Sequence, residues 1–278
     1  MPTDVRFPFP AVASPGWVIT TMLLFIAASG AWLFSPYFPL ELLRALDSAS
    51  AGWIAPTLAL AVVFGAVELW LLFVPGKQRP AILGWRADAL PAALAATLVA
   101  WLAMQASVVL ASRLGDTPLA WNPGWAEGGL LPGALIAQLF GTALLEETVF
   151  RAWLWPQLAL RMARRWPARR AWAVALLVSQ GAFALLHLPA HIAAGTPSSV
   201  LAGVVSGLFL TGIVLALLYA ATRNLFFVVG VHALGNAPTL LFEPQGPQPT
   251  LVLLGASILV AATWWWWRRL PGKQRHAS

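Results

Sequence analysis

The sequence contains no cysteine, and only 10% of its 278 residues carry a charged side chain. Without cysteine the chain can form no disulfide, no thiolate nucleophile and no cysteine-ligated metal site. A soluble globular domain usually has about 25% charged residues, whereas 59% of the residues here are hydrophobic. These proportions exclude an ordinary soluble domain. They indicate a membrane protein in which residues 1–278 form a single integral membrane domain.

Hydrophobic runs of the length needed to cross a bilayer, roughly 20 residues, recur along almost the whole chain. They lack the alternation of barrel strands, and in lipid only helices and closed barrels satisfy their backbone hydrogen bonds. We therefore predict an all-α fold, a polytopic transmembrane bundle of about eight helical spans, with a kink at Pro156 in the fourth. The predicted spans are residues 17–35, 53–74, 90–112, 131–157, 171–190, 199–220, 225–241 and 250–267.

The basic residues lie mainly between the spans, so the net charge of +7 does not indicate nucleic-acid binding. If alternate connections face the cytoplasm, one side holds 14 of the 17 lysines and arginines and the other side holds two. By the positive-inside rule this contrast predicts an even number of spans and two cytoplasmic termini. The expected location is the inner (plasma) membrane of a bacterium, crossed several times, because the Ala-, Arg- and Trp-rich composition is typical of a high genomic GC content.

A few ionisable side chains fall inside the predicted spans, where each costs about 2.5–3.5 kcal/mol on insertion scales and is a candidate functional residue. Glu147 and Arg151 lie four residues apart, one helical turn, so we expect them to form an ion pair. Glu146 points about 100° away from Glu147 and needs a partner from another helix. Glu68, in the second span, is expected to make a buried hydrogen bond or an interhelical pair, with a catalytic role as the alternative.

Two histidines stand in similar four-residue patterns in other spans. The residues from Phe183 to His187 place an aromatic ring and an imidazole on one helix face, and those from His232 to Asn236 do the same for an imidazole and a carboxamide. Each pattern alone is typical of ordinary packing. Together with Glu146 they supply a carboxylate, two imidazoles and an amide, which are the groups needed to activate water and to bind an oxyanion.

The three patterns resemble the motifs of the CPBP family, the CAAX prenyl proteases and bacteriocin-processing enzymes, which are glutamic-type intramembrane proteases. The resemblance covers about residues 130–240, the expected catalytic core. The family motif EExxxR is matched from Glu146 to Arg151, FxxxH from Phe183 to His187, and HxxxN from His232 to Asn236.

The resemblance implies an intramembrane endopeptidase, a hydrolase that cleaves a membrane-associated peptide or protein. It implies that Glu146, assisted by His187, acts as general base on a water molecule. It also implies that His232 and Asn236 donate hydrogen bonds to the oxyanion. The supporting residues would be Glu147, Arg151 and Phe183.

The glutamic mechanism needs no cofactor, but Glu146, His187 and His232 are also of types that bind zinc, so a divalent metal such as zinc stays open. The sequence has no HExxH, GxSG or GxGD motif, which excludes three other classes of intramembrane protease. The alternative function is a non-proteolytic transporter or scaffold that uses the Glu/His cluster as a proton relay or a structural network. Asn236 favours the protease, because an oxyanion site needs an amide donor and a proton relay does not. The expected partners are a peptide or protein substrate and the lipid bilayer, and no nucleic acid.

Overall fold

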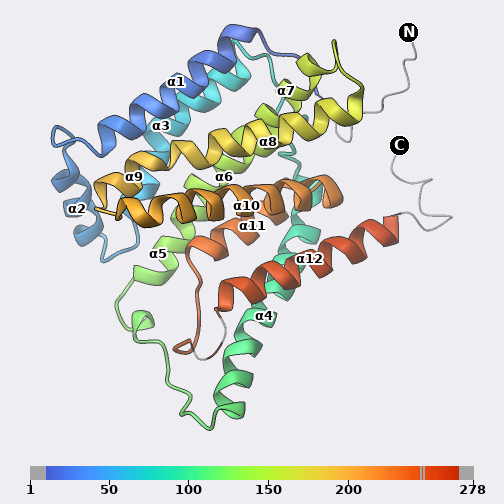
Figure 1. Ribbon diagram of the computed structural model, residues 1–278. Helices are drawn as coiled ribbons and strands as arrows, with labels where there is room; N and C mark the ends of the chain where they lie inside the picture. The colour runs from blue at the N-terminus through green and yellow to red at the C-terminus, as the bar shows by residue number, and fades with distance from the viewer. Residues whose placement is uncertain (1–10, 245, 247, 269–278) are drawn as a thin grey trace. The chain divides into compact units, whose positions relative to one another are not determined.

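The computed structural model describes residues 11–244, 246 and 248–268, and most of them are helical (Figure 1). The described residues also include one isolated antiparallel bridge, between Trp121 and Phe242. The helices are α1 (Gly16–Leu33), α2 (Leu40–Ala49), α3 (Pro56–Phe73), η1 (Ala87–Ala89), α4 (Leu90–Leu114), η2 (Pro123–Trp125), α5 (Leu130–Ala137), η3 (Gln138–Thr142), α6 (Ala143–Glu146), η4 (Glu147–Leu154), α7 (Trp155–Met162), α8 (Ala168–Leu186), α9 (Leu188–Ala193), α10 (Ser198–Thr222), α11 (Leu225–Asn236) and α12 (Pro249–Arg268).

The predicted all-α, polytopic fold class is confirmed, since seven of the described helical stretches are long and apolar enough to cross a membrane. The length predicted for residues 225–241 is wrong. The helix α11 ends at Asn236, and its 12 residues extend about 18 Å, less than the roughly 30 Å of a hydrocarbon core. The next residue, Ala237, precedes Pro238, and a residue before proline is disfavoured in the helical conformation. The predicted cytoplasmic termini include residues 1–10 and 269–278, which lie outside the described residues.

The chain forms two compact units. Unit 1 comprises Met1–Leu42, Ala61–Trp85 and Leu145–Leu217, and unit 2 comprises Leu43–Leu60, Arg86–Leu144 and Leu218–Ser278. The first two motifs lie in unit 1, and the third lies in unit 2.

In unit 1 the main pairing is that of α7 with α8, which connects the first motif to the second. The Trp155 indole N–H donates a hydrogen bond to the Trp172 carbonyl at 3.0 Å, and the two indole rings meet edge to face. The helix α1 lies beside α3 (Figure 1), where the ring centroids of Phe25 and Phe64 are 6.2 Å apart. Aromatic contacts of this kind stabilise helix pairing beyond the area they bury.

Buried polar side chains of unit 1 hold the segment that precedes α1. The Ser14 backbone N–H donates to the Gln157 side-chain oxygen at 2.8 Å, and the Ser14 hydroxyl donates to the Gly76 carbonyl at 3.0 Å. The Trp153 indole N–H in turn donates to the Ser14 hydroxyl at 3.0 Å. Because buried polar groups are stable only when hydrogen-bonded, this network fixes the start of α1 against η4 and α7.

In unit 2 the helix α4 packs against both α11 and α12. A Cβ atom at Gly230 would lie only 2.4 Å from Thr97 Oγ1, so the approach of α11 to α4 requires glycine at this position. The side chain of Gln105 donates to the Thr239 carbonyl at 3.1 Å and accepts from the Leu241 N–H at 3.0 Å. These bonds pin the segment after α11 to α4.

The fourth predicted span, residues 131–157, lies within the helical stretch Leu130–Met162, which is not a uniform α-helix. It contains two π-helical segments, η3 and η4, and inside η3 Gly141 has the non-helical angles φ −128° and ψ −105°. The break therefore lies at Gly141 and not at the predicted Pro156, which stands in the first turn of α7 directly after η4. π-Helical segments inside α-helices often occur at functional sites.

Candidate active site

Glu147 and Arg151 form the buried ion pair that their spacing predicts. The Nη1 atom of Arg151 lies 3.1 Å from Oε1 of Glu147, and both side chains are fully buried. They belong to η4, in which all eight residues are buried. An isolated charge in a protein interior is costly, so each of these charges depends on the other.

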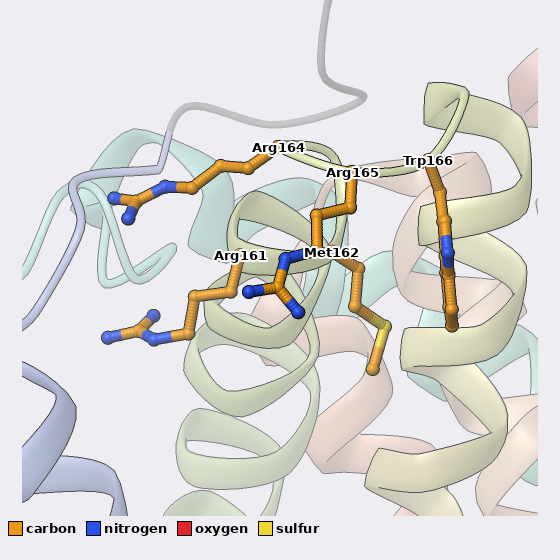
Figure 2. A pocket seen from close by; sticks show the side chains of 5 residues that line it. All are labelled: Arg161, Met162, Arg164, Arg165 and Trp166. Carbon is orange, nitrogen blue, oxygen red and sulfur yellow. The ribbon is translucent and has the colours of Figure 1, made fainter.

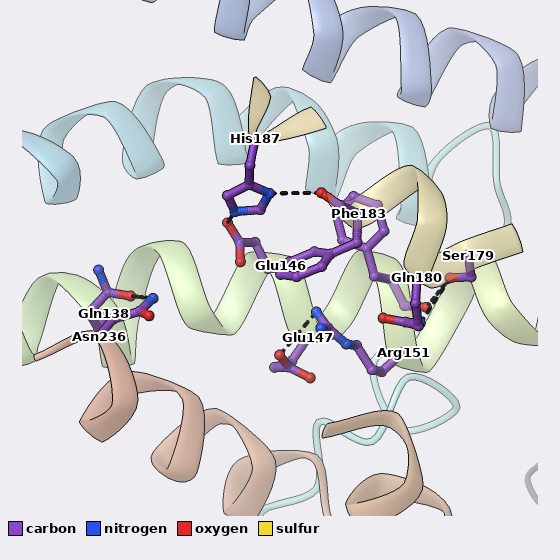
Figure 3. A network of polar contacts seen from close by, with 10 residues as sticks. Gln138, Glu146, Glu147, Arg151, Ser179, Gln180, Phe183, His187 and Asn236 are labelled. Atoms are coloured by element: carbon purple, nitrogen blue, oxygen red, sulfur yellow. Dashed lines mark hydrogen bonds and ion pairs between the residues drawn. The ribbon is translucent and has the colours of Figure 1, made fainter. Parts of the chain in front are cut away.

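The ring of Phe183, on α8, connects this pair with His187 (Figure 3). The guanidinium carbon of Arg151 lies 4.1 Å from the Phe183 ring centroid, and the centroid of the His187 ring lies 4.6 Å from it. Gly212, on α10, leaves the room that this packing needs. A Cβ atom there would lie 2.8 Å from Gln180 Oε1 and 3.3 Å from Phe183 Cδ1. The first and second motifs thus share one packed cluster.

Glu146 turns away from the buried pair, as its position in the helix predicts, and faces His187. Its Oε1 atom lies 3.7 Å from Nε2 of His187, and the two side chains are 20% and 29% exposed, respectively. This exposure contrasts with the complete burial of Glu147, the next residue along the chain. The two adjacent carboxylates therefore have different environments, and only that of Glu146 is accessible to a reactant.

His187 is positioned by the end of α8, which stops one residue before it. Pro189, two residues later, has no backbone N–H and cannot continue the helix. The His187 N–H bonds to the Ala184 carbonyl at 3.3 Å, and the imidazole Nδ1 lies 2.7 Å from the Phe183 carbonyl oxygen. Because a carbonyl oxygen can only accept, Nδ1 carries a hydrogen. In the neutral ring Nε2, the nitrogen that faces Glu146, is therefore the acceptor.

Glu68 lies on α3, which packs against Leu145 beside the first motif. Its carboxylate interacts electrostatically with that of Glu146. The close packing of α3 accounts for this, since a Cβ atom at Gly65, one turn earlier, would lie 2.5 Å from Leu145 Cδ1. The hydrogen bond or interhelical pair that the sequence predicted for Glu68 stays a prediction, and its position near a second carboxylate adds an acidic neighbour.

The third motif lies in unit 2, on α11. His232 is 8% exposed, and Asn236 lies one turn later on an exposed part of the same helix. The Asn236 amide donates to the Gln138 side-chain oxygen at 3.1 Å (Figure 3). An amide group has two hydrogens to donate, and Gln138 accepts one of them.

Sequence reasoning missed three residues of these local networks, Gln138, Gln180 and Gly212. The two glutamines could have been found, because an amide within an apolar span is costly unless it is hydrogen-bonded. Gly212 has no such distinguishing feature, since Gly203 and Gly207 on the same helix would tolerate a Cβ atom with no neighbour within 4 Å. Only the packing of α10 distinguishes Gly212 from Gly203 and Gly207.

Within residues 11–244, 246 and 248–268, no three His, Cys, Asp or Glu side chains are grouped so that they could hold a metal ion. In unit 1 the pair that comes together is Glu146 with His187. Catalytic zinc sites use three protein ligands, so this pair alone does not make up such a site.

Residues 129–238 match the family model described as Rce1-like, the type II CAAX prenyl endopeptidases. The matched region, less than half of the chain, contains all three motifs and supports the resemblance seen in the sequence. No curated protein and no solved structure shows a significant match to the chain. The family is one of proteases, so the enzyme class is that of a hydrolase.

Proposed function

We propose that the chain is a multi-pass membrane protein that hydrolyses a peptide bond of a membrane-associated substrate. The proposal starts from the match of residues 129–238 to the Rce1-like type II CAAX prenyl endopeptidase model. The observation that carries the proposal is the approach of the accessible Glu146 carboxylate to His187, at 3.7 Å, beside a fully buried ion pair. The proposed location is the inner membrane of a bacterium, which the composition supports.

Glu146 is the proposed general base. Its Oε1 atom and Nε2 of His187 are close enough for one water molecule to lie within hydrogen-bond distance of both. With Nδ1 of His187 committed to the Phe183 carbonyl, the neutral ring offers Nε2 as a second acceptor. The water would donate one hydrogen to each residue, which directs its lone pair at the substrate. General-base assistance of this kind is worth about 10²–10⁴ in rate.

The reaction then follows from this arrangement. The water oxygen bonds to the scissile carbonyl carbon while Glu146 takes a proton, and the carbonyl oxygen becomes an oxyanion. The carbon–nitrogen bond then breaks as Glu146 returns the proton to the leaving amine. The oxyanion is assigned to His232 and Asn236. Support for that assignment comes from the HxxxN motif and from the position of the two side chains one turn apart on α11.

The buried pair has a supporting role in this proposal. Glu147 and Arg151 hold η4 and, through the Phe183 ring, the end of α8. They thereby set the distance between Glu146 and His187, which come from different helices. The scheme uses only groups of the protein and water, and it calls for no cofactor.

The experiment is peptide cleavage by purified protein in proteoliposomes. The probes are fluorescence-quenched peptides with a farnesylated cysteine fourth from the C-terminus and the same peptides without the farnesyl group. We expect Glu146→Gln and His187→Gln to lower kcat by at least about 10². The matched control is His191→Gln, one turn after His187 on α9, which should stay within about threefold of wild type because His191 is outside the described cluster.

Two outcomes would contradict the proposal. One is a kcat for Glu146→Gln within tenfold of that of wild type, with the variant folded and inserted. The other is an equal loss of activity in His187→Gln and His191→Gln, which would indicate a general effect on this end of α8. A substrate preference for the farnesylated peptides would identify the prenyl group as part of what the site recognises.

A further inference from the structure

The turn between α7 and α8, in unit 1, concentrates positive charge to an unusual degree. Five arginines fall within the ten residues 161–170, and no acidic residue occurs in the sequence between Glu147 and Glu243. A pocket of about 470 Å³ lies at this turn (Figure 2). Its lining residues are Arg161, Met162, Arg164, Arg165 and Trp166.

The three arginines of the pocket differ in how they are held. Arg161 donates to the Gln157 side-chain oxygen at 3.0 Å and also to the Ser14 carbonyl, so its guanidinium is fixed. Arg164 and Arg165 are exposed, and Arg164 repels Arg161 electrostatically. Figure 2 shows all three guanidinium groups on the same side of Trp166. Within the part of the chain that the structure describes, none of the three forms an ion pair with a carboxylate.

The turn also lies where a membrane surface is expected. The candidate span Leu130–Met162 ends at its start, and the candidate span Ala168–Ala193 begins just after it. Met162 and Trp166 give the pocket an apolar wall, and the Arg170 guanidinium lies 4.9 Å from the centroid of the Trp166 ring. Tryptophan and arginine are typical of the headgroup level of a bilayer, and this turn is on the side that the charge distribution predicts to be cytoplasmic.

We propose that this pocket binds the phosphate-bearing headgroup of an anionic phospholipid. Guanidinium groups match phosphate oxygens in geometry and charge, and basic pockets between transmembrane helices on the cytoplasmic side are suited to anionic headgroups. The phosphate contacts Arg164 and Arg165 beside the fixed Arg161, while Trp166 and Met162 contact the start of the acyl chains. The positive-inside rule requires charge at this turn, but it does not require three guanidinium groups around a cavity.

Binding here would act on the helix pair that carries the proposed site, although the inference does not rest on the proposed function. An anion removes the mutual repulsion of the arginines at the turn, and this turn joins α7 to α8. The helix α8 carries Phe183 and His187, and α7 continues the segment that carries Glu146. Bound anionic lipid is therefore expected to stabilise the α7–α8 pair.

The test compares the full chain in nanodiscs of phosphatidylcholine with and without phosphatidylglycerol, at constant ionic strength. Native mass spectrometry counts retained phosphatidylglycerol, and thermal unfolding gives the shift in Tm that it causes. Arg164→Gln/Arg165→Gln should weaken apparent phosphatidylglycerol binding by at least about tenfold, since each basic group near an anionic surface contributes on the order of a fivefold factor. The matched control removes two exposed charges elsewhere on the predicted cytoplasmic side, Lys77→Gln/Arg79→Gln, and should stay within about twofold.

Arg164→Lys/Arg165→Lys keeps the charge and controls for damage to the turn; it should bind phosphatidylglycerol more tightly than the glutamine variant and less tightly than wild type, because lysine lacks the planar guanidinium group. Competition by inorganic phosphate would support phosphate recognition as the shared chemistry. Three results would overturn the proposal. They are equal loss of binding in the two glutamine double variants, equal retention of phosphatidylglycerol and phosphatidylcholine, and a Tm shift that inorganic phosphate reproduces in full with no further gain from lipid.

Discussion

Replacing Arg151 by methionine removes the charge that balances Glu147 inside η4. Both side chains are fully buried, with Nη1 and Oε1 3.1 Å apart. Loss of one partner of a buried ion pair costs about 3–5 kcal/mol, because the other charge is left uncompensated. The variant also loses the cation–π contact with Phe183 at 4.1 Å. We therefore expect Arg151→Met to lower the free energy of unfolding by about 3–5 kcal/mol.

The assay is reversible unfolding in mixed micelles with an increasing mole fraction of sodium dodecyl sulfate, followed by tryptophan fluorescence. The matched control is the double variant Glu147→Leu/Arg151→Met, which removes both charges and fills a similar volume. Replacing a whole buried pair by apolar residues is often neutral or stabilising, so the double variant should recover most of the loss. A single variant within about 1 kcal/mol of wild type, or a double variant less stable than the single one, would refute the reasoning.

Gly212→Leu should destabilise the protein and lower activity, because even a Cβ atom at this position meets side chains of the cluster at 2.8 and 3.3 Å. The control in the same micelle unfolding assay is Gly207→Leu on the same helix, where a Cβ atom has no neighbour within 4 Å. Equal losses of stability in the two variants would argue against the packing role of Gly212. Pro189→Ala should lower kcat with little change in stability, because it lets α8 continue and draws the His187 backbone N–H toward the Phe183 carbonyl, in competition with Nδ1. Peptide cleavage measures this effect, and an unchanged kcat would show that the end of α8 does not position the imidazole.

The Glu147–Arg151 pair could be predicted from sequence because both residues lie on one helix. Four-residue spacing fixes their geometry locally, whatever else the chain does. The same holds for the different direction of Glu146, which follows from the rotation per residue. Its contact with His187 was suggested only by the combination of motifs, since the approach of two helices is not encoded in either helix alone.

The irregularities of the fourth span could not be predicted in the same way. Proline at position 156 favoured a kink there, yet the backbone breaks at Gly141 and widens to a π-helix before the proline. The hydrogen bonds of a helix can change from the α to the π pattern at a small cost in free energy when the change improves tertiary packing. The early end of α11, in contrast, could have been predicted from the sequence, because Pro238 restricts the conformation of the residue that precedes it.

Contacts that depend on separate helices were the least predictable. Gly212 is one of several glycines on α10, and its role follows only from the side chains that pack against it. Glu68 is a similar case, since its place near Glu146 depends on how α3 packs against Leu145. The sequence marked Glu68 as unusual for a span but held no information on which acid it would face.

The hydrogen bond from Nδ1 of His187 to the Phe183 carbonyl has a consequence for the design of inhibitors. A ring held in this way cannot turn over to exchange its two nitrogens without losing that bond. In its neutral form the protein therefore presents an acceptor, not a donor, beside the Glu146 carboxylate. Compounds that carry hydroxyl or N–H groups in place of the scissile carbonyl, such as hydrated ketones, should bind there better than compounds that offer another carbonyl oxygen.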